Sequence, residues 1–232
     1  MKRITKGNTP AALNRWVRRQ RGINCSYGEM PADVKGEVKE RLMREQGGLC
    51  CYTGIRIAPE KCHIEHLMPQ RMCTAGREDV DYNNLLAAYP GESTRRREPR
   101  CPFGAHQKGD WYDENLFVHP LLPDCEQRFE FDLNGGIEPR REDDEAAVET
   151  IRRLKLDHGR LVDLRRERIE ETFFTARLSE AQVRQLRDSV YEKDQKGRYR
   201  EFCFTIFQAC ELYLRKLERS RARRVAIHRQ RG

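Results

Sequence analysis

Two histidines and a glutamate lie close together in the stretch CHIEHLMPQ, residues 62–70, at positions His63, Glu65 and His66. In an extended chain alternate side chains point to opposite faces, so Glu65 and His66 separate while His63 shares the face of Glu65. The carboxylate could hold a cation while the neutral imidazole of His66 takes a proton from an attacking water. An ordinary strand with polar residues on its exposed face would carry the same residue types.

Two later motifs add further polar residues, DYNNLLAA at 81–88 and GAHQKGDW at 104–111. They contain Asn84, His106 and Lys108. A histidine brought back by a short helix could complete the protein ligands of a cation. Hydrated Mg²⁺ needs few protein ligands and keeps waters that substrate phosphate can replace. The combined set therefore indicates metal-assisted chemistry at a phosphodiester.

The elements that must position these motifs follow from the spacing of apolar residues. Val34, Val38 and Leu42 recur every four residues and predict a helix over 31–48, which Gly47 and Gly48 end. Residues 49–57, LCCYTGIRI, favour a strand. Residues 58–140 are rich in Gly, Pro, Cys and His with short apolar runs, which is typical of an irregular region that carries a site.

From about residue 143 the apolar spacing becomes helical. It predicts a helix from about 143, a second that begins near 157, a third opened by a Ser179–Gln182 capping box, and a last one over 202–217 with a basic tail. RFEFDL, followed by turn residues, predicts a hairpin that is scaffold or a partner-docking element. We expect an α+β fold that is predominantly α-helical, with a helical segment at 1–48, a site-bearing core at 49–140 and a helical bundle at 141–232.

Composition and charge narrow the classes of partner. Charged residues make up 35% of the 232 residues, and 45 Lys and Arg against 37 acids give a net charge of +8. A basic balance favours polyanions such as DNA or RNA. No apolar run is long enough for a membrane span, and the basic N-terminal residues precede no apolar segment of a secretory signal. We therefore expect a cytoplasmic protein with no membrane partner.

Nine cysteines are many for such a protein, and an odd number without a signal peptide argues against a disulfide framework. Metal ligation and burial as small apolar residues remain as interpretations. Cys50 is followed by Thr53 where a CxxC pair would have its second cysteine. Because four-cysteine zinc sites are indicated by closely spaced pairs, this spacing counts against structural zinc.

The motifs EQGGLCCYTGIRI, HIEHLMPQ, DYNNLLAA, HQKGDW and FVHPLLPDCEQRFEFDLNGGIEP together resemble the HNH endonuclease family. In particular they resemble the HNH component of Septu-type anti-phage systems, which also occurs with retrons, and the resemblance spans nearly the whole chain. It implies a ββα-metal (HNH) catalytic core embedded in a helical scaffold. It also implies a metal-dependent endonuclease that hydrolyses DNA or RNA, with an ABC-type ATPase partner that licenses cleavage during phage infection.

The resemblance assigns roles to particular positions. His66 matches the general base, and Glu65 takes the place of a metal ligand beside it. Asn84 matches the central Asn, which braces the loop between the strands. His106 matches the final His, a metal ligand, and His63 is either a further ligand or a structural residue. The implied cofactor is a divalent cation, Mg²⁺ first, with Mn²⁺ or another transition metal as alternatives.

The expected nucleic-acid contacts lie outside these motifs. Lys108 stands where a phosphate contact would be useful. The insertion YPGESTRRREPRCPFG separates Asn84 from His106 and carries a basic cluster that we expect to bind the phosphate backbone. The cluster consists of Arg95, Arg96, Arg97 and Arg100. The C-terminal arginines Arg219, Arg221, Arg223 and Arg224 either bind backbone or form a solvated face.

Two other functions are compatible with part of the sequence. One is a non-catalytic nucleic-acid-binding or adaptor module on an HNH-like scaffold, and the other is a zinc-ribbon regulator without hydrolysis. The presence of Glu65, His66, Asn84 and His106 together favours catalysis over the first. The interrupted cysteine pair counts against the second.

Overall fold

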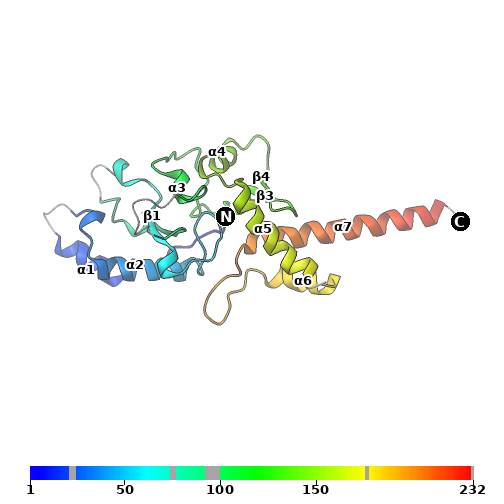
Figure 1. Ribbon diagram of the computed structural model, residues 1–232, viewed down its shortest axis with the longest axis horizontal. Coiled ribbons are helices and arrows are strands. Elements are labelled where there is room, and N and C mark those ends of the chain that lie inside the picture. The colour runs from blue at the N-terminus through cyan, green and yellow to red at the C-terminus, as the bar shows by residue number, and fades with distance from the viewer. Residues whose placement is uncertain (21–24, 74–76, 92–99, 176–177, 231–232) are drawn as a thin grey trace.

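The computed structural model describes residues 1–20, 25–73, 77–91, 100–175 and 178–230. The molecule is elongated, with α1 at one end and α7 projecting from the other (Figure 1). The α-helices are α1 (Ala11–Arg19), α2 (Ala32–Glu45), α3 (Ala105–Lys108), α4 (Glu145–Leu154), α5 (Gly159–Glu170), α6 (Glu180–Ser189) and α7 (Cys203–Gln230). The strands are β1 (His63–His66), β2 (Leu85–Ala88), β3 (Phe129–Phe131) and β4 (Ile137–Pro139). Short 3₁₀ helices at Tyr27–Glu29, Pro59–Lys61, Gln70–Met72 and Tyr82–Asn84, and a π-helical turn at Glu171–Thr175, complete the elements.

The helix expected over 31–48 is confirmed as α2. Val34, Val38 and Leu42 are its buried residues, as the four-residue spacing predicts. The helix ends before Gly47 and Gly48, whose φ angles of 57° and 70° lie in the left-handed region that favours glycine. α2 therefore presents one apolar face to the body and stops where the chain must turn toward the hairpin.

β1 and β2 form an antiparallel hairpin in which His63 pairs with Ala88 and His66 pairs with Leu85. Side chains along β1 alternate between partly exposed and buried, so His63 and Glu65 share one face and His66 lies on the other. All residues of β2 are buried. The predicted separation of Glu65 from His66 is therefore confirmed, and a short hairpin of alternating polarity positions both.

The strand expected over 49–57 is wrong, because the structure gives only an isolated bridge between Leu49 and Arg56. Cys50 N–H donates to the Ile55 carbonyl at 2.8 Å, so the segment folds back and pairs with itself. Gly54, with φ 78°, permits the reversal, and a Cβ there would lie 2.6 Å from the Phe204 ring. The apolar residues of the segment are buried as expected, but in a tight turn.

The helices expected after residue 143 are confirmed as α4 to α7. Asp144 caps α4 by accepting from Ala147 N–H, and the Ser179–Gln182 capping box opens α6. The predicted hairpin after residue 128 is also present, since β3 pairs with β4 in antiparallel register. The α+β class, with small antiparallel sheets among helices, follows from these elements.

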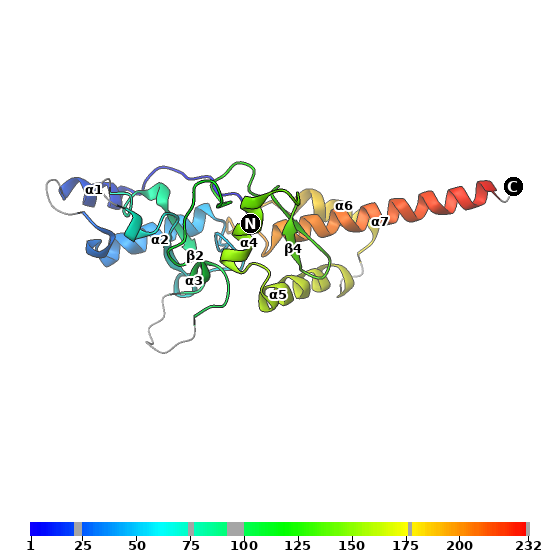
Figure 2. The ribbon, with the colours of Figure 1, turned by 90° about the horizontal axis from the view of Figure 1, so that it is seen from above.

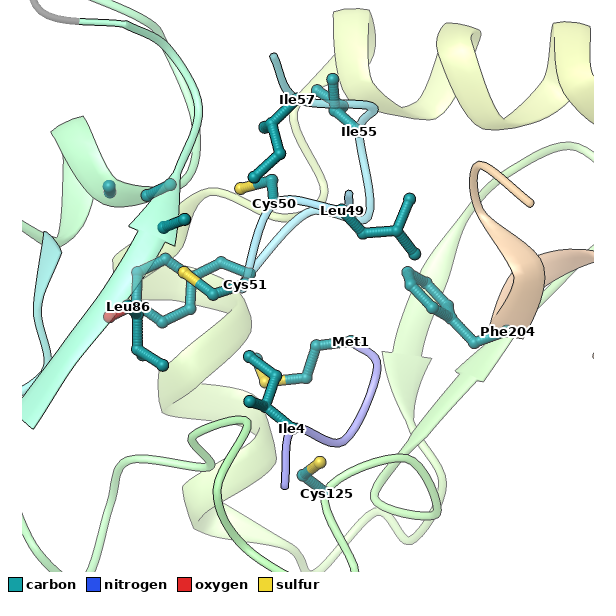
Figure 3. Packing of buried hydrophobic residues seen from close by; sticks show 14 of the residues in the cluster. Met1, Ile4, Leu49, Cys50, Cys51, Ile55, Ile57, Leu86, Cys125 and Phe204 are labelled. Atoms are coloured by element: carbon teal, nitrogen blue, oxygen red, sulfur yellow. The ribbon is translucent and has the colours of Figure 1, made fainter. Parts of the chain in front are cut away.

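One cluster of buried apolar residues runs through all three parts of the chain. Met1 and Ile4 of the first segment lie beside the turn at 49–57, Leu86 of β2 and Phe204 of α7 (Figure 3). The predicted boundaries at residues 48 and 140 separate regions that share this core, and the division of the chain stays a prediction.

The segment before α1 and the helix α3 lie on opposite sides of the body (Figure 2). Among the described residues, none of the helices combines the length and the apolar character needed to cross a membrane.

Candidate active site

The hairpin and α3 bring four of the predicted site residues together. The His63 Nε2 atom lies 3.5 Å from Glu65 Oε2, and Lys108 Nζ lies 3.0 Å from Glu65 Oε1. The rings of His63 and His106 have centroids 5.8 Å apart. Residues separated by more than forty positions thus meet on one face of β1 because α3 returns the chain to the hairpin.

Glu65 is a shielded carboxylate with several donors. Its side chain is only 12% exposed, and Tyr52 donates its hydroxyl to Oε1 at 3.3 Å. Burial alone would raise the pKa of Glu65, but the hydrogen bond from His63 and the charge of Lys108 hold that pKa below its ordinary value. Glu65 is therefore ionised at neutral pH. Tyr52 was missed by sequence reasoning, because nothing in CCYTG marks its hydroxyl as a partner of the hairpin.

Lys108 is placed differently from the expected phosphate contact. The residue is 3% exposed, and its ammonium donates to the His66 carbonyl at 3.0 Å and the Gly109 carbonyl at 3.4 Å as well as to Glu65. All of these partners belong to the protein. A buried carboxylate is stabilised by a paired cation, and Lys108 supplies that cation. These contacts suit a supporting role for Lys108, and its contact with phosphate stays a prediction.

His63 is held at both ring nitrogens. Nδ1 donates to the Pro90 carbonyl at 2.6 Å, while Nε2 faces Glu65. Burial lowers the pKa of His63, but Glu65 and the Pro90 carbonyl outweigh burial and raise it above its ordinary value. The protonated ring would donate to both partners. These contacts are at least as compatible with a structural role for His63 as with a role as a metal ligand.

His66 lies on the opposite face of β1, where its ring meets the Asp79 carbonyl, the Gln70 amide and the Tyr27 ring. Its Nε2 lies 2.9 Å from the Asp79 carbonyl, which can only accept, so Nε2 carries the proton and Nδ1 keeps its lone pair in the neutral ring. Tyr27 contacts the ring edge-on with centroids 4.6 Å apart. Burial lowers the pKa of His66 below its ordinary value, so the ring is neutral near pH 7. A neutral imidazole with a fixed tautomer is chemically able to accept a proton.

Asn84 holds the chain between the two strands through its side-chain amide. Oδ1 accepts from Met68 N–H at 2.7 Å, and Nδ2 donates to the carbonyls of Met68 and Glu78 at 3.0 and 2.9 Å. The residue is 8% exposed. These bonds fix the chain at Met68 and at Glu78, the residue before Asp79, whose carbonyl orients His66. Asn84 therefore acts on His66 through the backbone.

His106 lies in the single turn of α3, and its ring is oriented by a backbone donor. Cys101 N–H donates to Nδ1 at 2.9 Å, which places the ring proton on Nε2 in the neutral form. Gly104 N–H donates to the Leu154 carbonyl at 2.7 Å and fastens α3 to α4. Burial, His63 and Arg100 together lower the pKa of His106. Its ring is neutral at pH 7 and lies near His63.

A comparison with known proteins adds an independent observation. The chain is 27% identical over 184 residues to "Retron Vc95 putative HNH endonuclease" from Vibrio cholerae serotype O1 biovar El Tor, covering 74% of this chain and 83% of that protein. The chain is therefore a relative of a protein that this name describes. The relationship confirms the HNH and retron parts of the resemblance inferred from the motifs and supports a nuclease, while the Septu part stays a prediction. No protein-family model matches the chain.

The residues that would hold a cation in an HNH site fit that role by type but not by their present arrangement. Carboxylate and imidazole donors suit Mg²⁺, Mn²⁺ or a transition metal. Within the described residues, however, no three His, Cys, Asp or Glu side chains form a group that could hold a metal ion. Lys108 and His63 already satisfy Glu65, and a neutral His106 carries its proton on Nε2 while Cys101 donates to Nδ1. Cation binding would require these contacts to change.

The insertion arginines fall mainly outside the described part of the chain. Arg95, Arg96 and Arg97 lie in residues 92–99, which the structure does not describe. Arg100 is described and exposed. Its charge acts on the His106 ring, so this end of the insertion lies close to α3. The backbone-binding role of the four arginines stays a prediction.

Proposed function

We propose that this protein is an HNH-type endonuclease that hydrolyses phosphodiester bonds of DNA or RNA and uses His66 as the general base. The observation that carries the proposal is the setting of His66 beside Glu65 on a hairpin. Its proton is fixed on Nε2 by the Asp79 carbonyl, so Nδ1 is the basic atom. The retron-associated relative supports the same reaction class.

In the proposed reaction His66 takes a proton from a water molecule at Nδ1. The water oxygen forms the new bond to phosphorus, and the bond from phosphorus to the leaving oxygen breaks. The leaving oxygen keeps the electron pair of that bond and takes a proton from solvent water. Asn84 keeps the Asp79 carbonyl in place and so preserves the tautomer of His66 during turnover. The buried position of His66 favours its neutral form and hence its action as a base at pH 7.

We further propose that a divalent cation, Mg²⁺ in the first place with Mn²⁺ or another transition metal as alternatives, acts with this base. Glu65 and His106, with His63 as a third candidate, are the proposed protein ligands. A bound cation would supply stabilisation of charge on the phosphate. Because the present contacts of Glu65 and His106 are made to protein groups, ligand formation includes release of Lys108 or Cys101 from them.

The remaining proposals concern partners. An ABC-type ATPase that licenses cleavage is supported by the resemblance to Septu-type systems. Binding of the nucleic-acid backbone by Arg95, Arg96, Arg97 and Arg100 is supported by their place between the two motif elements and by the exposure of Arg100.

The test is cleavage of DNA and RNA by purified chain together with the ATPase, in Mg²⁺ and in EDTA. We expect cleavage in Mg²⁺ and none in EDTA. Replacing His66 by Ala should reduce the rate by about 10²–10⁴-fold, the usual loss for a positioned general base. His158→Asn is the matched control, because His158 is the N-cap of α5 with its ring packed against Phe103, and Asn also caps helices well.

Folded His66→Ala protein that cleaves as fast as wild type would contradict the assignment of the base. Binding of nucleic acid without cleavage under every condition would favour the non-catalytic adaptor module. A cleavage rate unaffected by EDTA would leave the base assignment standing and remove the cation from the proposal.

A further inference from the structure

A cavity bounded by the first segment, the end of α2 and the chain before α7 is lined mainly by cations. We call it the basic cavity; its charged residues are Lys2, Arg3, Lys6, Arg41, Arg44, Lys193 and, as the one carboxylate, Glu45. Its volume is about 620 Å³, within the range of roughly 300–1,000 Å³ typical of small-ligand sites. None of the residues that line it belongs to the candidate active site. The first segment lies across the body from α3 (Figure 2).

Half of these cations have no acidic partner. Arg3, Arg44 and Lys193 are exposed, and no carboxylate of the described residues lies within ion-pair distance of their side chains. Lys2 pairs with Glu126 at 2.6 Å, and Arg41 pairs with Glu45 at 3.0 Å. Gathering like charges from three distant segments costs repulsion unless an anion is present.

A second cavity of similar size shows that this imbalance is not general on the surface. The cavity beside α4 has a volume of about 600 Å³ and contains three arginines and four carboxylates. Its Arg128 pairs with Asp144, and its Arg141 pairs with Asp143 at 2.8 Å. Two of the three arginines there are paired with carboxylates, whereas Arg3, Arg44 and Lys193 of the basic cavity remain available to a ligand.

One wall of the basic cavity is formed by a fixed aromatic ring. Tyr199 N–H donates to the Gly47 carbonyl at 3.0 Å, and its ring occupies the space that a Cβ at Gly47 would need, 2.3 Å away. Lys193 and Lys2 lie 4.9 and 5.4 Å from the ring centroid. Contact with an aromatic face restrains both ammonium groups, so less ordering is required when a ligand binds.

Lys6 connects the basic cavity to the hairpin. Its ammonium lies 3.6 Å from the Tyr82 ring centroid and donates to the carbonyl of Leu85 at 2.8 Å. Leu85 is the residue that pairs with His66. Burial lowers the pKa of Lys6 to about 8, while its ion pair with Glu45 Oε2 at 3.9 Å acts in the opposite direction. Lys6 therefore contributes a cation that the protein already pairs.

We propose that the basic cavity binds phosphate groups, from either a free polyphosphate or a nucleic-acid strand. Several cations around one small volume suit a ligand with several negative charges, and the guanidinium groups of Arg3 and Arg44 match phosphate oxygens in geometry. This site requires neither His66 nor a divalent cation, so it stands independently of the proposed hydrolysis.

The test measures binding by the full chain in EDTA, which prevents metal-dependent cleavage. Inorganic tripolyphosphate is one probe, and a single-stranded oligonucleotide with or without a 5′-phosphate is the other. Calorimetry should give saturable binding to wild type. Arg44→Ala/Lys193→Ala should weaken it by about tenfold or more, because two charge-assisted contacts are lost. Arg15→Ala/Arg18→Ala on α1 is the control, since it removes the same charge outside the cavity.

Loss confined to tripolyphosphate identifies a free polyphosphate as the ligand, and loss confined to the oligonucleotide identifies a strand. Either supports the proposal. No saturable binding of either probe, or equal weakening in the control variant, would overturn it. A second measurement labels wild-type lysines with an amine-reactive reagent, and the bound probe should protect Lys193 more than Lys196, which lies outside the cavity. Equal labelling of both with and without probe would also count against the site.

Discussion

Lys108 and Glu65 form an ion pair in which both side chains are shielded from water. Their exposed fractions are 1% and 12%. Removing one partner of a buried pair leaves an uncompensated charge, which costs far more than the pair itself contributes. The same pairing places Lys108 in competition with any cation that approaches Glu65.

Lys108→Met should therefore lower the free energy of unfolding by about 3–5 kcal/mol, measured by chemical denaturation. Adding Mn²⁺ should raise the melting temperature of this variant more than that of wild type, because the cation can take the vacated place beside Glu65. Arg71→Ala is the control. Its pair with Asp110 has side chains that are 65% and 64% exposed, and such pairs contribute about 0–1 kcal/mol. A Lys108→Met protein as stable as wild type would show that Glu65 does not depend on Lys108.

For the individual residues of β1, the sequence predicted which face each side chain occupies but not which groups it contacts. Two-residue periodicity was enough to place His63 beside Glu65 and to separate His66. The contact with Lys108 depends on where α3 meets the hairpin, and the contact with Tyr52 depends on the turn at 49–57. Neither follows from local spacing.

The hairpin is bound to α2 by one buried side chain. Gln46 donates to the Ala87 carbonyl at 2.8 Å and to the Leu49 carbonyl at 2.8 Å, and its Oε1 accepts from Ala87 N–H at 2.8 Å. The amide thus pairs with β2 as a neighbouring strand would. This contact holds the strand opposite β1 and so supports the register that positions Glu65 and His66.

Gln46→Leu should destabilise the fold by about 2–4 kcal/mol, because the buried groups left without partners cost about 1–3 kcal/mol each. The change keeps the side chain close to its original size, so the loss reports hydrogen bonding. Gln185→Leu on the exposed face of α6 should change stability by less than about 0.5 kcal/mol. Denaturation curves for both variants decide the matter, and equal small effects would mean that α2 packing alone retains β2.

Elements with local determinants were predictable, and those set by distant contacts were not. The capping box at Ser179 and the apolar spacing of α2 are encoded within a few residues, so both were recovered. Residues 49–57 have a strand-like composition, yet Gly54 and the neighbouring Phe204 ring favour a turn. The irregular stretch before α3 gave no periodic pattern from which its path could be inferred.

The whole molecule is organised around a core to which the first residues of the chain and the beginning of α7 both contribute. Met1 is 1% exposed and Phe204 is 3% exposed, and both belong to the same cluster as the hairpin. Sequence composition indicated the three regions because it changes at their borders. It could not indicate that they share one interior, since that depends on packing between residues some 200 positions apart.

α7 has 28 residues and is therefore about 42 Å long. Its last described side chains, residues 219–223, are exposed, and the helix extends away from the body in both views (Figures 1 and 2). A particle with such an arm meets more friction in water than a sphere of the same 27.4 kDa mass. It should sediment more slowly and show an extended tail in its distribution of interatomic distances.

Ending the chain after residue 221 should shorten the maximum dimension from X-ray scattering by about 13 Å and leave the melting temperature unchanged. An unchanged dimension would mean that the arm folds against the body in solution.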